Sequence, residues 1–239
     1  GSHVYEPGED VLINVKQKIG KLFVDTVTRY TQFAISDDVP QGLSYKSARV
    51  LDESGGDVTD KGTLSYDETS KTVKFEFSSG FIQSQSSYDG SQYTLEITAA
   101  ADSPEGGSAV ITDTARSTIS GIDQETNEQS LKVDTPYHVS YEYVSGSQGR
   151  SLPEEISVSK GAYAISDSET YYQGDEVLRK ENPAEGEKLE IRDDDGSPYG
   201  SWVLSWDEEK KTVENADIVF TGTWRYVPAP RLVIVKKMK

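Results

Sequence analysis

The sequence contains no cysteine, which excludes disulfide bonds, thiol catalysis and thiolate zinc sites. Histidine is nearly as scarce, and beyond residues 1–3, which resemble an expression-tag remnant, His138 is the single histidine. No apolar run approaches the roughly 20 residues of a transmembrane helix, so we expect no membrane insertion in this segment. Neither a G-x-x-x-x-G-K-[ST] phosphate loop nor a G-x-S-x-G nucleophile motif is present. We therefore expect no enzyme and place His138 on the surface of a strand.

Positive charge is also scarce, because 24 lysines and arginines face 41 aspartates and glutamates and leave a net charge of −17. Such a surface repels polyanions, so we expect neither nucleic acid nor an anionic membrane as a partner. The charge is typical of a well-solvated extracellular segment, and we expect the chain to be a monomer.

Aromatic residues and strict two-residue alternation are abundant by contrast. The chain has 14 tyrosines, and residues 72–78 and 92–98 each alternate between apolar and polar side chains. Strands with one buried and one wet face are typical of sandwiches of antiparallel sheets. Turn-forming runs of Gly, Asp, Ser and Pro separate these strands. We therefore predict a mainly β chain, long enough at 239 residues for two domains.

Three further alternating segments lie in the second half of the chain, at residues 137–146, 201–207 and 215–224. Each segment places aromatic and aliphatic side chains on one face, as a half-buried strand does. The residues that share a face are Tyr137, Val139, Tyr141 and Tyr143; Trp202, Leu204 and Trp206; and Ile218, Phe220, Trp224 and Tyr226.

Prolines mark two breaks in this series of strands. Residues 133–136 are the best domain boundary, and residues 226–231 form a linker that two prolines stiffen. We therefore predict one domain at residues 4–135 and another at 136–228. Residues 229–239 are a linker or the start of a further module, and the alternative of a last strand of the second domain stays open.

The second half of the chain resembles the SHIRT domain, a streptococcal high-identity tandem repeat of surface proteins. The resemblance rests on separated motifs in one order: V-x-Y-x-Y-V-S-G at 139–146, L-P at 152–153, W-x-x-x-W-D at 202–207 and N-A-D-x-x-F-x-G-T-W at 215–224. It covers roughly residues 136–228. It implies a small β-rich module that serves as a rod segment and holds another part of the protein away from a cell wall.

The first half resembles isopeptide-forming fimbrial and adhesin domains. Residues 25–45 are similar to the D-x-V-T…L-P-x-G-L-x-Y signature of those domains. Residues 48–59 and 93–98 resemble the C-terminal domains of antigen I/II-type adhesins. The resemblance implies an immunoglobulin-like antiparallel β-sandwich, so the predicted fold is such a sandwich followed by a smaller β-rich SHIRT-like module.

The same resemblance implies an internal crosslink, in which a lysine on an early strand bonds an asparagine or aspartate on a late strand. Burial removes the proton from a lysine and makes it a nucleophile, because desolvation disfavours the charged form. A buried carboxylic acid polarises the carbonyl group and shuttles the proton. The product restricts the unfolded chain much as a disulfide does.

The candidates for this chemistry are the nucleophiles Lys16 and Lys18, the acid Asp37, and the acceptors Asp113 and Asn127. Alternation turns Asp37 and Asp113 inward, although Asp113 stands where the family carries asparagine. Alternation sends both lysines outward unless a bulge intervenes. The alternative is that the lysines are solvated and the two aspartates bond the backbone at strand ends.

The acidic run at residues 192–196 does not match an EF-hand loop, and a hairpin turn explains it more simply. We expect no cofactor, although a calcium site elsewhere in the first domain stays open. The predicted function is a structural stalk segment of a cell-wall-anchored adhesin or fimbrial protein of a Gram-positive bacterium. The alternative is that the first domain itself binds a host glycan or protein.

Overall fold

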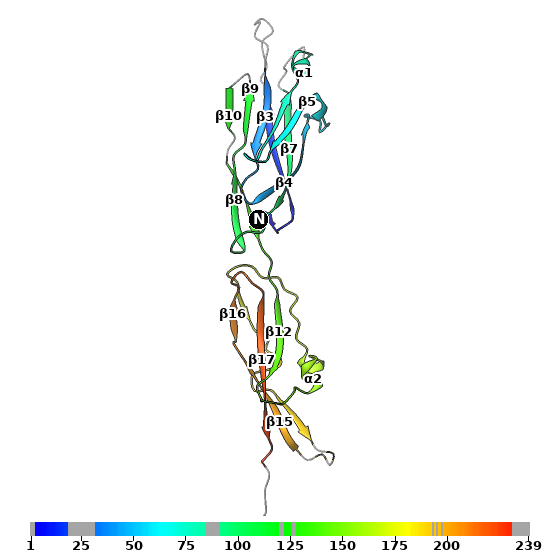
Figure 1. The fold of residues 1–239 in the computed structure, drawn as a ribbon, viewed down its shortest axis with the longest axis vertical. Coiled ribbons are helices and arrows are strands. Elements are labelled where there is room, and N and C mark those ends of the chain that lie inside the picture. The colour runs from blue at the N-terminus through cyan, green and yellow to red at the C-terminus, as the bar shows by residue number, and fades with distance from the viewer. Residues whose placement is uncertain are drawn as a thin grey trace, which may run out of the picture. The chain divides into compact units, whose positions relative to one another are not determined.

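The computed structural model describes residues 3–18, 32–84, 91–119, 122–125, 128–192, 194, 196 and 198–230 (Figure 1). The chain divides into two compact units, Gly1–Thr135 and Pro136–Lys239. Strands dominate both units, so the predicted mainly β class is confirmed. No helix in the part of the chain described is long and apolar enough to cross a membrane.

The first unit is built from eleven described strands and two short helices. The strands are β1 Val4–Tyr5, β2 Asp10–Lys18, β3 Phe33–Asp38, β4 Leu43–Leu51, β5 Gly62–Asp67, β6 Thr72–Phe77, β7 Gln92–Ala101, β8 Ser108–Asp113, β9 Arg116–Ile119, β10 Ile122–Glu125 and β11 Gln129–Asp134. The helices are η1 Thr59–Lys61 and α1 Ser79–Ser84.

These strands form three sheets, in the orders β2-β7-β4, β10-β9-β3-β6-β5 and β1-β11-β8. The pairing of β2 with β7 is antiparallel and runs without a bulge from Asp10↔Ala100 to Lys18↔Gln92. The pairing of β1 with β11 is parallel. The first and last strands of this unit are therefore neighbours, which the strand patterns alone did not indicate.

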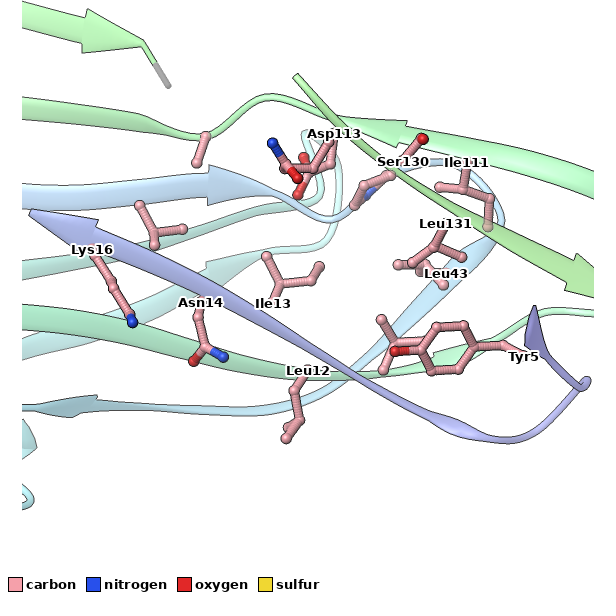
Figure 2. Close-up of a pocket in the computed structure, with 15 residues that line it drawn as sticks. Tyr5, Leu12, Ile13, Asn14, Lys16, Leu43, Ile111, Asp113, Ser130 and Leu131 are labelled. Carbon is pink, nitrogen blue, oxygen red and sulfur yellow. The ribbon is translucent and has the colours of Figure 1, made fainter. Parts of the chain in front are cut away.

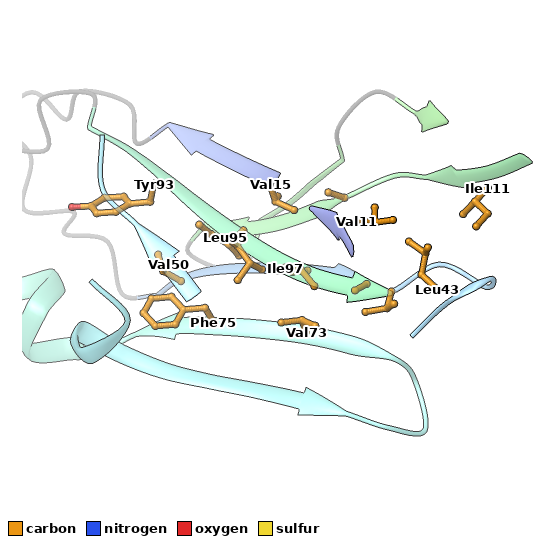
Figure 3. Packing of buried hydrophobic residues seen from close by; sticks show 14 of the residues in the cluster. Val11, Val15, Leu43, Val50, Val73, Phe75, Tyr93, Leu95, Ile97 and Ile111 are labelled. Carbon is orange, nitrogen blue, oxygen red and sulfur yellow. The ribbon is translucent and has the colours of Figure 1, made fainter. Parts of the chain in front are cut away.

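The core of the first unit lies between the inward faces of β7 and β6. Leu95 and Ile97 on β7 are fully buried, and so are Val73 and Phe75 on β6. Figure 3 shows Phe75 facing Leu95 and Val50 across the sandwich. Because alternate side chains of a strand point to opposite faces, the predicted alternation of residues 72–78 and 92–98 is what fills this core.

The second unit contains six described strands and two short helices. They are β12 Val139–Ser145, α2 Glu154–Ser157, η2 Gly161–Tyr163, β13 Glu176–Leu178, β14 Lys188–Arg192, β15 Pro198–Trp206, β16 Lys210–Thr212 and β17 Ile218–Pro228. The main sheet has the order β12-β17-β15-β14, and β13 pairs with β16 in a separate ribbon. The central strand β17 pairs in parallel with β12 and antiparallel with β15.

The core of the second unit is aromatic. Phe220 and Trp224 on β17 are fully buried, and Trp202 and Leu204 on β15 are nearly so. The ring of Tyr141 on β12 stacks on Phe220 with centroids 5.5 Å apart. The side chains that the alternation assigned to shared faces are buried or half-buried. Those between them are exposed along residues 138–142, whereas Val203 and Ser205 on β15 are half-buried.

Candidate functional site

Asp37 is the most unusual polar residue of the first unit. It lies near the end of β3, at a position where the inward face of the strand continues from Ile35. Asp37 is 2% exposed, and neither carboxylate oxygen has a hydrogen-bond partner among the described residues. Burial raises its pKa to about 7, and the charge of Asp113 adds to the rise. An acid of this kind holds its proton up to neutral pH.

Asp113 supplies the second carboxyl group of the pair. It is the last residue of β8 and lies opposite Gln129 in the ladder with β11. Its side chain is half-buried, and burial raises its pKa, with a further contribution from the charge of Asp38. The structure therefore brings Asp37 and Asp113 close enough for the charge of Asp113 to raise the pKa of Asp37.

The two candidate lysines lie elsewhere on the unit. Lys16 and Lys18 are exposed on the outer face of β2. Figure 2 shows Lys16, like Asn14 and Leu12, projecting from β2 away from Asp113, whereas Ile13 projects to the other side. The ladder with β7 has no bulge that would turn Lys16 inward. Among the described lysines none contributes to the pKa shift of Asp37, although Arg116 opposes that shift weakly.

The inward position between the two lysines belongs to Gln17. Its side-chain oxygen accepts a hydrogen bond from the buried hydroxyl group of Ser117 on β9. This hydrogen bond joins two sheets. Gln17 occupies the kind of inward position on β2 that the crosslink chemistry would need for its lysine. The sequence reasoning missed it, because an amide and a hydroxyl group on strands a hundred residues apart carry no local signal.

Three other predicted features are Asn127, the acidic run at residues 192–196 and His138. Asn127 lies outside the described residues, and so does part of the acidic run at 192–196. His138 is exposed beside β12, and its backbone N–H donates to Asp217. Within the described ranges, no group of three or more His, Asp or Glu side chains is arranged to hold a metal ion.

A groove of about 440 Å³ adjoins the Asp113 carboxyl group (Figure 2). One wall is the stretch of β2 from residue 11 to residue 16, and the other comes from β8 and β11. Leu43, Ile111 and Leu131 give the groove an apolar end. No motif or alternation in the sequence indicates this groove, since the groove depends on which strand edges stay unpaired and not on which strand faces are apolar.

Comparisons with protein families match both halves of the chain. Residues 3–133 match the family described as cell surface antigen I/II C2 terminal domain. Residues 135–227 match the SHIRT domain family. A search of curated proteins finds no match.

Several solved structures resemble parts of the chain. The C-terminal domain of a Streptococcus agalactiae AgI/II polypeptide, BspA, is 14% identical with a TM-score of 0.42, over 55% of this chain and 44% of that one. The N-terminal domain of the Streptococcus gordonii adhesin Sgo0707 is 18% identical with a TM-score of 0.46, over 54% and 30%. A SHIRT domain 10 from a cell surface protein is 23% identical with a TM-score of 0.29, over 39% and 99%. The chain spans less than half the length of the two larger streptococcal structures.

Proposed function

The chain belongs to the cell surface antigen I/II C2 terminal domain family, and from this premise we propose that it is a stalk segment of a surface adhesin. In this role the two units keep a binding region away from the cell and resist extension. A segment outside the present sequence anchors the protein to the cell wall. A host or bacterial surface ligand binds the parent protein.

The observation that carries the proposal is the parallel pairing of the terminal strands in the second unit. The first strand, β12, pairs with the last, β17, over seven residue pairs from Val139↔Ile218 to Ser145↔Trp224. Force on a stalk pulls the start of β12 and the end of β17 in opposite directions along the strands. Because the strands are parallel, that force shears all the ladder hydrogen bonds together instead of opening them one by one.

The hydrogen bonds of this ladder can be assigned to alternate residues of β12. The carbonyl of His138 accepts from Ile218, and the N–H of Gly146 donates to Trp224. Since N–H and C=O of one strand residue point to the same side, Ser140 and Glu142 direct both groups toward β17. Both side chains are exposed, so a change there alters the ladder with little effect on the core.

The first unit has a shorter version of this arrangement. Its terminal strands pair in parallel through Val4↔Lys132 and Tyr5↔Val133 alone among the described residues. A covalent tie would add most here, and the crosslink of Lys16 or Lys18 to Asp113, with Asp37 as the acid, stays a prediction. It requires β2 to turn one lysine inward, a change that a register shift of one residue would produce.

Single-molecule force spectroscopy on the full chain between inert handle domains tests the proposal. Ser140→Pro removes one N–H from the β12–β17 ladder, and we expect the second unit to unfold at a lower force. The matched control is Glu190→Pro on the edge strand β14. Glu190 is exposed. The carbonyl of Glu187 accepts a hydrogen bond from the N–H of Leu204 on β15. Backbone groups alternate in direction along a strand, so Glu190, three residues further on, directs its N–H away from β15.

The control variant should unfold at the wild-type force. Equal unfolding forces for Ser140→Pro and the wild type would contradict the shear argument. Chemical denaturation of the same variants measures how much each proline lowers the free energy of unfolding. Both prolines replace exposed strand residues, so a difference in unfolding force that exceeds the difference in free energy is a mechanical effect.

A further inference from the structure

The groove beside Asp113 is bounded by strand edges and not by strand faces. Along β2, six consecutive residues from Val11 to Lys16 line it, and along β11, Gln129, Ser130 and Leu131 do so. Alternate residues of a strand face opposite sides, so a wall made of consecutive residues is the edge of the strand. The groove therefore presents the backbone N–H and C=O groups of two strands.

Both of these edges are unpaired along the groove in the part of the chain that the structure describes. β2 is the outer strand of its sheet and pairs with β7 alone. On the side of β11 away from β8, β1 covers Lys132 and Val133 and leaves residues 129–131 open. Free strand edges bind extended chains unless charge, proline or a bulge protects them. Residues 11–15 of β2 carry no charge and no bulge.

The lining is apolar at one end and acidic at the other. Leu43, Ile111 and Leu131 form the apolar end, and Leu12 at the rim is 56% exposed. Asp113 lies on the wall, with the buried and unpartnered Asp37 close enough to feel its charge. Figure 2 shows Lys16 at the rim projecting away from Asp113, and among the described residues only Arg116 acts on Asp37 as a cation, weakly.

We propose that this groove binds an extended, basic peptide segment of a partner protein, which adds as a strand between β2 and β11 and directs a lysine or arginine side chain to Asp113. The backbone edges provide sequence-independent hydrogen bonds, and the pockets for alternate side chains select the residues, as in other cases of strand addition. Six residues of β2 span about 20 Å, which sets the length of the bound segment at six or seven residues. The proposal is independent of the stalk function.

Charge decides between this occupant and others. The Asp113 carboxylate and the net charge of −17 repel anionic partners such as acidic glycans and nucleic acids. An apolar strand without a cation would satisfy the backbone edges but would desolvate the Asp113 carboxylate without giving it a partner, at a cost in free energy. A cation on the inward face of the strand removes that cost.

The test uses the full chain and two labelled heptapeptides, Thr-Lys-Thr-Val-Thr-Leu-Thr and its reverse, Thr-Leu-Thr-Val-Thr-Lys-Thr. Each places a lysine, a valine and a leucine on one face of a strand, and the two sequences allow for either strand direction. Binding is followed by fluorescence anisotropy. We expect saturable binding of at least one peptide, with the peptide in which methionine replaces lysine binding at least about tenfold more weakly.

Protein variants provide the matched comparison. Asp113→Asn should weaken the lysine peptide by at least about tenfold, because it removes the charge that faces the groove. Glu105→Gln removes the same charge from an exposed turn outside the groove and should leave the affinity unchanged. Hydrogen exchange on the bound chain should show new protection in β2 and β11.

Four results of the binding and exchange experiments would overturn the proposal, and a fifth comes from the chain without peptide. They are no saturable binding of either peptide, equal binding of the lysine and methionine peptides, equal effects of Asp113→Asn and Glu105→Gln, and exchange protection outside β2 and β11. Protection of β2 that grows with protein concentration in the absence of peptide would also overturn it, because a second copy of the chain would then be the occupant.

Discussion

The buried carboxyl group of Asp37 should make the first unit less stable as pH rises, and replacing it by asparagine should remove that dependence. The unfolded chain ionises Asp37 near its ordinary pKa of 3.8, whereas the folded chain ionises it at about 7. Between these values the folded state binds more protons than the unfolded state. The contribution of Asp37 to stability is therefore greatest at low pH, falls as pH rises from about 4 to about 7, and then levels off.

The size of this effect follows from the shift in pKa. A rise from 3.8 to about 7 corresponds to roughly 4 kcal/mol of stability lost by pH 8. Asp37 is 2% exposed, so solvent does not screen the effect appreciably. Asp37→Asn cannot ionise, and its stability relative to the wild type should be roughly 4 kcal/mol better at pH 8 than at pH 4. The difference between the two pH values cancels any constant cost of burying the amide.

Denaturant unfolding of the full chain at several pH values measures this difference. Trp202, Trp206 and Trp224 are the three tryptophans of the sequence and all lie in the second unit. Tryptophan fluorescence therefore follows the second unit and serves as an internal control, while far-UV circular dichroism also follows the first. Asp60→Asn, at a side chain that is 71% exposed, provides the matched control and should show no such pH difference.

Asp113→Asn tests the coupling within the pair. The charge of Asp113 is the second largest cause of the raised pKa of Asp37, so its removal should shift the fall in stability to lower pH without abolishing it. A pH difference below about 1 kcal/mol for Asp37→Asn would refute the reasoning, because it would mean that water or a cation reaches this carboxyl group.

Three further predictions concern the crosslink and the two cores. The crosslink of Lys16 to Asp113, which requires β2 to turn this lysine inward, should lower the intact mass of the denatured chain by about 18 Da, one water, mapped to both residues; an unshifted mass would contradict the crosslink and agree with the outward Lys16 of Figure 2. Phe75→Ala should destabilise the first unit by about 3–5 kcal/mol in denaturant unfolding followed by circular dichroism, since Phe75 is fully buried, and a loss below about 1 kcal/mol would contradict the assigned core. Tyr137→Phe removes a 2.6 Å hydrogen bond to Asn215 and should cost the second unit about 1 kcal/mol by tryptophan fluorescence, whereas an unchanged midpoint would show that water replaces the bond.

Strand alternation predicted the faces of the residues that matter most. It turned Asp37 and Asp113 inward and both candidate lysines outward, and the structure places them so. The reason is that the side-chain period of a strand is two whatever strand lies beside it. Where the resemblance suggested Lys16 as a nucleophile, the alternation already indicated an exposed side chain.

Alternation could not predict which strands become neighbours. The parallel pairs β1–β11 and β12–β17 join segments at opposite ends of each unit, and such long-range pairing leaves no trace in either segment alone. The groove was beyond prediction for the same reason, since it exists where β2 and the start of β11 have no further neighbour among the described strands. The hydrogen bond from Ser117 to Gln17 likewise depends on two strands that the sequence does not connect.

Both proposals involve β11, the last strand of the first unit. The terminal strands pair over different lengths in the two units. The terminal strands of the second unit form seven parallel residue pairs, whereas those of the first form two among the described residues. A strand bound between β2 and residues 129–131 would extend the ladder on the open side of β11 and connect it to the early strand β2. Those added hydrogen bonds lie next to the short terminal pair that force would load first. Partner binding in the groove would therefore strengthen the unit whose ends are less firmly joined, so recognition and resistance to extension depend on the same strand edge.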